Sequence, residues 1–212
     1  MYLPRHFEQD DTRELHRLMR SHPLGILVTR GADGLTANHL PFLVFDEPAP
    51  HGRLQAHVPR ANPVWRDHQE DEDALVVFQG PQAYVSPSWY PGKREHGKVV
   101  PTWNYSVVHA HGPLRVIDEA AWLLQHLERL TETQEGLREE PWKLADAPAD
   151  FVAGLVKALV GIEIPLRRLE GKWKVSQNRS EADRQGVVDG LLGENTDAAA
   201  AVADLMVRQS ID

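Results

Sequence analysis

The chain of 212 residues contains no cysteine, so disulfide bonds and thiolate chemistry are excluded. It also lacks an apolar run long enough to cross a bilayer. The first 20 residues contain no apolar core of the kind found in signal peptides. Together these absences predict a soluble, cytoplasmic protein with no membrane partner.

Positive charge is also in short supply. There are 23 Lys and Arg residues against 31 Asp and Glu residues, which gives a formal net charge of -8. A protein whose affinity comes mainly from the phosphates of nucleic acid needs clustered cations. No segment resembles a helix-turn-helix with a basic recognition helix. We therefore expect no tight, direct binding to DNA, although a local basic patch is still allowed.

Histidine is abundant, with 11 residues, but no two have the helical spacing and accompanying glutamate of a zinc site. His109 and His111 are two residues apart on a predicted strand and would face the same side. A metal pair is one interpretation of them. Two half-buried strand histidines are the simpler one, because no third ligand can be identified. The sequence thus predicts no metal site.

Short strands dominate the first 118 residues. Leu24–Arg30 and Leu35–Phe45 flank a Gly31–Gly34 turn and predict a β-hairpin. Gly80-Pro81 predicts another turn. Further strands are predicted at 53–58, 74–79, 82–86, 102–112 and 114–118, with a kink or bulge at Gly112-Pro113. This close spacing is typical of a β-barrel or a β-sandwich.

Helical patterns follow the strands. The apolar residues of 119–134 share one face of an amphipathic helix. Helices are also predicted at 148–160, 180–192 and 197–208, and one more strand at 161–169. Ser180 and Asp183 have the spacing of a helix cap. We find no repeat and no low-complexity linker, which indicates one compact unit with a helical tail.

The segment from Tyr84 to Gly112 is rich in aromatic rings. It holds five of the ten Trp and Tyr residues of the chain, namely Tyr84, Trp89, Tyr90, Trp103 and Tyr105. Rings beside polar side chains suit a flat, partly polar ligand that is buried on its faces and hydrogen-bonded at its edges. An ordered loop whose rings cap a β-core explains them equally well, so both interpretations stay open.

The segment around Arg60 offers a second candidate site. Asn62 and Pro63 have the pattern of an N-cap followed by the first residue of a short helix. The unpaired N–H groups of a helix N-terminus attract anions, and Arg60 lies beside them. This pattern predicts a phosphate-binding site. The alternative is an ordinary capped helix with a surface arginine.

Five sequence blocks resemble the PaiB-like family of FMN-binding split-barrel proteins, often labelled negative transcriptional regulators. The blocks are HLPF (39–42), HVPRANPVW (57–65), YVSPSWY (84–90), VPTWNYSVVHAHG (100–112) and KWKVSQNR (172–179). The resemblance implies a six-stranded antiparallel split β-barrel with flanking helices over residues 1–190, followed by a C-terminal helical tail over 191–212. It also implies a homodimer with FMN at the subunit interface.

The same resemblance assigns cofactor-binding residues. Arg60, with the N–H groups around Ala61 and Asn62, would hold the phosphate. The strand that carries Asn38, His39 and Leu40 would face the flavin ring edge. The other implied cofactor-binding residues are His57, Trp103, Asn104, Tyr105, Lys174, Ser176 and Gln177. Lys172 is expected to be a plain surface charge.

The function implied by the resemblance is that of a transcriptional regulator or a flavin sensor without turnover. An FMN-dependent oxidoreductase that acts on a small molecule is the alternative, with a nicotinamide bound only transiently, because no Rossmann glycine fingerprint is present. A heme-binding split barrel is a weaker alternative that rests on His57, His109 and His111. No catalytic acid or base can be identified from the sequence.

Overall fold

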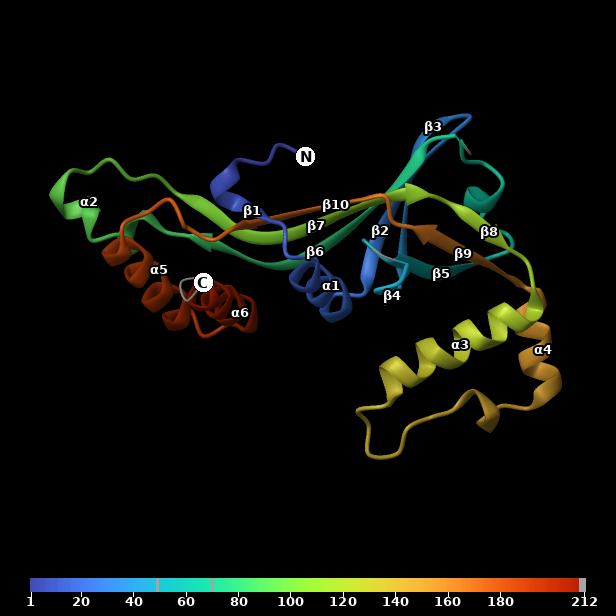
Figure 1. Ribbon diagram of the computed structural model, residues 1–212. Helices are drawn as coiled ribbons and strands as arrows, with labels where there is room; N and C mark the ends of the chain where they lie inside the picture. Colours follow the sequence, from blue (N-terminus) through green and yellow to red (C-terminus); the bar gives the residue numbers. More distant parts are fainter. Residues whose placement is uncertain (49, 70, 210–212) are drawn as a thin grey trace. The chain divides into compact units, whose positions relative to one another are not determined.

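The computed structural model describes residues 1–48, 50–69 and 71–209 (Figure 1). The chain divides into two compact units. Unit 1 comprises Met1–Leu18, Gln79–His109 and Glu170–Asp212, and unit 2 comprises Met19–Phe78 and Ala110–Leu169. Residues 191–209 of the predicted helical tail fall within unit 1, and residues 210–212 lie outside the described residues.

Two antiparallel sheets and flanking helices confirm the predicted mainly β fold. The strands are β1 (Glu8–Gln9), β2 (Leu24–Gly31), β3 (Gly34–Pro41), β4 (Leu43–Phe45), β5 (Arg53–Pro59), β6 (Asp73–Val85), β7 (Thr102–Pro113), β8 (Arg115–Ile117), β9 (Leu159–Pro165) and β10 (Arg168–Lys174). The helices are α1 (Thr12–Ser21), α2 (Gly92–Glu95), α3 (Ala120–Glu135), α4 (Ala149–Lys157), α5 (Glu181–Gly193) and α6 (Asp197–Arg208). The strand orders are β1-β10-β7-β6-β2-β3 and β4-β5-β9-β8.

The predicted hairpin is present as β2 and β3, which pair from Leu24 opposite Pro41 to Gly31 opposite Gly34. Pro41 ends the outermost strand of its sheet, where a missing N–H donor is tolerated. The strand predicted over Leu35–Phe45 is interrupted at Phe42, which is 2% exposed and packs edge-on against Phe78. The chain passes from one sheet to the other at this residue, because β3 and β4 belong to different sheets.

The turn predicted at Gly80-Pro81 is wrong, because β6 runs without interruption from Asp73 to Val85. A Cβ atom on Gly80 would lie 2.3 Å from the Oγ atom of Ser106 and 2.8 Å from the Cδ1 atom of Leu18. Glycine is therefore needed for close packing within unit 1, and not for a change of chain direction.

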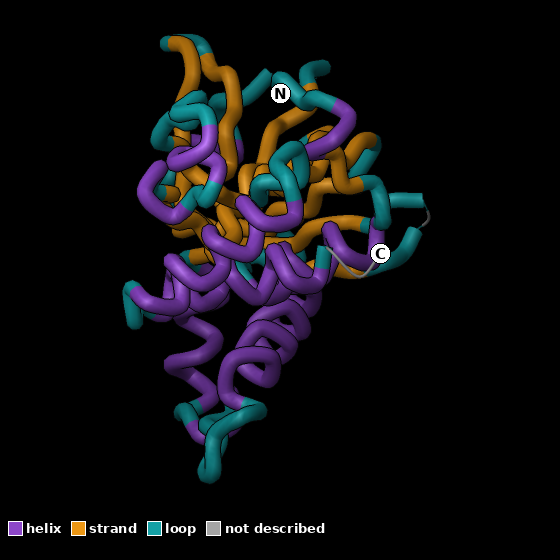
Figure 2. The backbone as a smooth tube through the Cα atoms, turned by 90° about the vertical axis from the view of Figure 1, so that its left-hand side faces the viewer, coloured by secondary structure: helices purple, strands orange, loops and turns teal. Residues whose placement is uncertain are grey.

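The second sheet lies in unit 2, where β5 pairs with β4 on one side and β9 on the other. Gln55 of β5 is buried, and its side-chain amide donates to the carboxylate of Glu163 at 2.9 Å. The single strand predicted over 161–169 is instead the end of β9 and the start of β10. Helices α3 and α4 pack on each other and on β9 through a small core of Leu123, Val152 and Val156. In Figure 2 the loop between these helices is the teal segment at the lower end.

Unit 1 contains β1 and β10, parts of β6 and β7, and the helices α5 and α6. Figure 1 shows α5 and α6 on one side of these strands and the N-terminal segment on the other. The predicted cap is confirmed, because the Oγ atom of Ser180 accepts a hydrogen bond from the N–H group of Asp183 at 3.2 Å. Among the described residues, no helix is both long and apolar enough to cross a membrane.

The close packing of β7 can be tested at Gly112. The interruption predicted at Gly112-Pro113 lies one residue later, because β7 ends at Pro113 and β8 begins at Arg115 in the other sheet. A Cβ atom on Gly112 would lie 2.0 Å from the carbonyl oxygen of Pro165, and a backbone atom cannot rotate away. Gly112→Ala should therefore lower the free energy of unfolding by about 1–3 kcal/mol, measured by urea denaturation.

The matched control is Gly154→Ala in α4, where a Cβ atom would meet nothing within 4 Å. Alanine should stabilise this helix by about 0.5–1 kcal/mol. Equal effects of the two substitutions would contradict the packing described for β7.

Candidate functional site

Strand β7 separates two chemically different faces within unit 1. Asn104 and Ser106 are completely buried, whereas Trp103 is 54% exposed and Tyr105 is half-buried. Successive side chains of a strand point to opposite faces, so this alternation gives one buried polar face and one open aromatic face. Three of the predicted cofactor-binding residues, Trp103 to Tyr105, are thus divided between the two faces.

On the buried face, Asn104 and Ser176 hydrogen-bond each other. The Nδ2 atom of Asn104 donates to the Oγ atom of Ser176 at 3.0 Å, and the Oγ atom lies 3.2 Å from Oδ1 of Asn104. The same Nδ2 atom lies 3.5 Å from the sulfur of Met206 in α6. Both residues were predicted to contact the cofactor, and the structure shows them beneath α6 with their polar groups satisfied by each other.

Gln177 has a local structural role as well. Its Oε1 atom accepts from the N–H group of Val175 at 2.8 Å, and its Nε2 atom donates to the carbonyl of Trp173 at 2.6 Å. Ser176 has a φ of 67°, in the left-handed region. The Gln177 amide therefore satisfies backbone groups where β10 ends.

The opposite, open face of unit 1 gathers rings and lysines from three strands. We define the open face as Tyr84 of β6, Trp103 and Tyr105 of β7, and Lys172 and Lys174 of β10. The rings of Tyr84 and Trp103 meet edge-on with centroids 6.1 Å apart. The Nζ atom of Lys172 lies 5.6 Å from the ring centroid of Tyr105, within the range of a cation–π contact.

Within the described part of the chain, the hydrogen-bond acceptors of Lys174 are uncharged. Its Nζ atom donates to the Oγ1 atom of Thr102 at 2.6 Å and to the carbonyl of Trp103. Partial burial, and then repulsion from Lys172 and Arg179, lower the pKa of Lys174. Glu8 is the cross-strand partner of Lys172 and lies at the margin of the open face. Lys172, Lys174 and Arg179 thus form a cationic cluster (named so below) that favours an anion.

In unit 2, the predicted residues of β3 and of the turn after β5 come together. Asn62 is the predicted cap, because its Oδ1 atom accepts from the N–H group of Val64 at 3.0 Å. Its Nδ2 atom donates to the Oδ1 atom of Asn38 at 2.8 Å. His39 and Ala61 are exposed and Leu40 is buried.

Arg60, the predicted phosphate ligand, is already hydrogen-bonded to protein groups. Its guanidinium donates to both carboxylate oxygens of Asp118, to the carbonyl of Lys157 at 3.0 Å and to that of Leu159 at 2.9 Å. The hydrogen bond from Arg60 lowers the pKa of Asp118. A phosphate at this position would have to compete with a carboxylate for the same donors.

His57 belongs to a buried pair in unit 2. Its Nδ1 atom lies 3.1 Å from the Nε2 atom of His126, whose ring stacks on Trp122 with centroids 5.1 Å apart. His126 is 1% exposed, and burial, followed by the charge of His57, lowers its pKa to about 4. Burial also lowers the pKa of His57. His57, one of the three histidines on which the heme alternative rests, therefore contacts the side chain of His126.

Comparisons with known proteins agree with the motifs and the fold. Residues 1–168 match the family described as "Putative FMN-binding domain". The protease synthase and sporulation protein PAI 2 of Bacillus subtilis is 34% identical over 206 residues, which cover 97% of this chain and 96% of that protein. The chain belongs to the PaiB-like family of FMN-binding split-barrel proteins.

Relatives of this PaiB-like protein also occur in fungi, and its fold recurs in solved structures. An uncharacterized protein of Emericella nidulans is 34% identical over 242 residues, covering 97% of this chain and 96% of the relative. The flavocytochrome Anf3 of Azotobacter vinelandii has a TM-score of 0.60 at 12% identity, covering 81% of this chain and 72% of that one. The FAD and heme binding protein of Mycobacterium smegmatis has a TM-score of 0.57 at 15% identity, covering 79% and 73%. At these identities the two structures establish the fold alone.

In this PaiB-like chain, two cations that the resemblance does not assign to the cofactor, Lys172 and Arg179, lie near Lys174. Lys172 was expected to be a plain surface charge, yet it lies two residues from Lys174 on β10 and therefore on the same face. The same spacing places Trp103 and Tyr105 together on β7. Two strands with matching two-residue spacings, one aromatic and one cationic, were the signal in the sequence.

The His57–His126 pair predicts a pH-dependent stability. An unfolded histidine titrates near pH 6.5, while the folded His126 has a pKa of about 4. Folding therefore favours the neutral form of His126. The resulting contribution to the free energy of unfolding is present above pH 6.5 and is lost as the pH falls toward 4. Lowering the pH from 7.5 to 5.5 should therefore reduce the free energy of unfolding by about 1 kcal/mol through this residue.

Urea denaturation of the wild type and of His126→Phe at pH 7.5 and 5.5 checks this expectation. Phenylalanine can keep the stacking on Trp122 but cannot take up a proton. The variant should lose less stability than the wild type over this interval, and an identical loss in both proteins would refute the assignment.

Proposed function

We propose that this protein binds FMN on the open face of unit 1. The observation that carries the proposal is that aromatic rings lie close to cations that have no carboxylate acceptor among the described residues. The rings of Trp103 and Tyr105 would contact the isoalloxazine, and the cationic cluster would hold the phosphate. Flat ring systems favour aromatic side chains, and a phosphate monoester is close to doubly charged at neutral pH.

The groups around each cation distinguish the two candidate phosphate-binding sites, Lys174 and Arg60. Among the described residues, the acceptors of Lys174 are a hydroxyl and a carbonyl, and partial burial, together with two neighbouring cations, disfavours its charged form. An anion would relieve that repulsion. Arg60 instead shares its donors with Asp118 and two carbonyls. We therefore favour Lys174 over Arg60. A role for Asn38, His39, Leu40, His57, Ala61 and Asn62 in flavin binding remains a prediction.

We propose that the bound flavin serves a sensor or regulatory role. FMN supplies reversible electron or hydride transfer when it is bound. The name of the Bacillus subtilis relative refers to protease synthesis and sporulation, which supports a regulatory role here. The net charge of -8 favours regulation without tight direct contact to DNA. Steady oxidation of NADH by the FMN-loaded protein would favour the oxidoreductase alternative.

Titration of the apo-protein with FMN and with riboflavin, which lacks the phosphate, tests the site. Loss of a charged hydrogen bond costs about 1.5–3 kcal/mol, or about ten- to a hundred-fold in affinity. Lys174→Gln should weaken FMN binding by about this factor and leave riboflavin binding nearly unchanged. Quenching of flavin fluorescence reports both affinities.

Arg60→Gln is the matched comparison, because it removes the other candidate cation. It should change the ratio of FMN to riboflavin affinity less than about threefold, within the range of surface substitutions. If Arg60→Gln selectively weakened FMN and Lys174→Gln did not, the phosphate seat would lie at the Asn62 turn.

We further propose that the protein is a homodimer. Trp103 and Tyr84 are 54% and 47% exposed in the single chain, and a ring face of this kind is often covered by a partner. Light scattering at micromolar concentration should give about twice the chain mass of 23.9 kDa. A clean monomer that binds FMN with full affinity would refute a shared site.

A further inference from the structure

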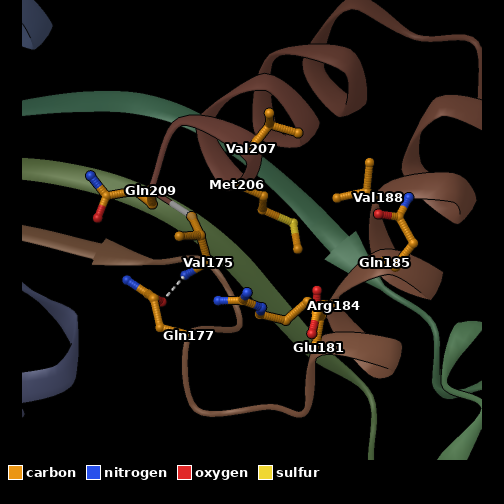
Figure 3. A pocket seen from close by; sticks show the side chains of 9 residues that line it. All are labelled: Val175, Gln177, Glu181, Arg184, Gln185, Val188, Met206, Val207 and Gln209. Carbon is orange, nitrogen blue, oxygen red and sulfur yellow. Dashed lines mark hydrogen bonds between the residues drawn. The ribbon is translucent and has the colours of Figure 1, made fainter. Parts of the chain in front are cut away.

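A cavity of about 200 Å³ lies in unit 1, between the end of β10 and the helices α5 and α6. Val175, Gln177, Arg184, Val188, Met206 and Val207 are among the residues that line it (Figure 3). It is close in size to the roughly 150 Å³ cavity that can hold a benzene molecule in a protein core. The cavity is therefore large enough for a small organic molecule.

Arg184 is the cationic residue of this lining. Its Nε atom is buried, and it has no hydrogen-bond partner among the described residues. Figure 3 shows its guanidinium extending from α5 toward Val175 and Gln177. A guanidinium remains charged at every physiological pH, and a buried donor without an acceptor is unfavourable. This Nε–H group therefore lacks an acceptor that a ligand could supply.

The other lining groups limit what that ligand can be. Val175, Val188, Met206 and Val207 present hydrocarbon and sulfur, and the amide side chains of Gln185 and Gln209 also border the cavity. The amide of Gln177 is already hydrogen-bonded at both ends to the backbone of β10 and the residue that follows it. Glu181 also borders the cavity and disfavours a ligand with several negative charges. One carboxylate on a short apolar body matches this arrangement.

We propose that this cavity binds a small monocarboxylate of about four to six carbon atoms, whose carboxylate pairs with Arg184. The cavity is separate from the proposed flavin site. Met206 contacts Asn104 on the buried face of β7, whereas Trp103 points to the open face. The two ligands should therefore bind unit 1 without excluding each other.

Isothermal titration calorimetry with butyrate, butyramide and octanoate tests the proposal. Butyrate should bind with a dissociation constant of about 1 mM or below, as expected for a ligand of this size. Butyramide, which has the same shape without the charge, should bind about ten- to a hundred-fold more weakly. Octanoate should be too long. Absence of butyrate binding at 10-fold higher concentration, about 10 mM, would overturn the proposal.

Three further measurements identify the site. Arg184→Gln should weaken butyrate about ten- to a hundred-fold and leave FMN affinity unchanged. Arg208→Gln is the matched control, because Arg208 lies on α6 outside the lining and pairs with Asp204 at 2.8 Å. It should bind butyrate like the wild type. Val188→Phe should fill the cavity and also block butyrate.

Two outcomes would refute the assignment even if butyrate binds. Full affinity in both Arg184→Gln and Val188→Phe would place the ligand elsewhere. Competition between butyrate and FMN would show that the cavity belongs to the flavin site. Failure of FMN binding alone would leave the butyrate result interpretable, since each ligand is titrated separately.

Discussion

The mutual hydrogen bonds of Asn104 and Ser176 are the interaction on which the candidate site depends. Asn104 is completely buried, and an unsatisfied amide there would cost about 1–3 kcal/mol. Ser176 supplies the partner from the end of β10, where its φ of 67° turns the chain away from the sheet. This pair fixes β7 relative to the end of β10. Since strand side chains alternate, it also directs Trp103, Tyr105 and Lys174 to the opposite face.

The charged partners of each cation distinguish the two candidate anion-binding sites, Arg60 and Lys174. Arg60 has the stronger sequence signal, with a guanidinium beside a helix start, but folding pairs it with Asp118 in unit 2. Lys174 has the weaker signal, but folding surrounds it with cations and neutral acceptors in unit 1. A charged side chain identifies an anion site only when its partners in the folded protein are known.

The sequence was sufficient wherever the determinants are local. The β2–β3 hairpin, the Asn62 and Ser180 caps and helix α6 depend on residues close in sequence, and all were predicted. The uninterrupted β6 was not predicted, because Gly80 is required by packing against Ser106, which is distant in sequence. The Arg60–Asp118 pair joins residues 58 positions apart, and no local pattern reveals it. Resemblance identified the family, but it could not distinguish buried Asn104 from exposed Trp103.

The most direct test of the account is a crystal structure of the protein soaked or co-crystallised with FMN. The isoalloxazine should lie in van der Waals contact with Trp103 or Tyr105, and the phosphate should lie within hydrogen-bonding distance of the Nζ atom of Lys174. The Asn104–Ser176 hydrogen bonds should be unchanged. A phosphate bound by Arg60 and the N–H groups near Asn62, with Asp118 displaced, would contradict it.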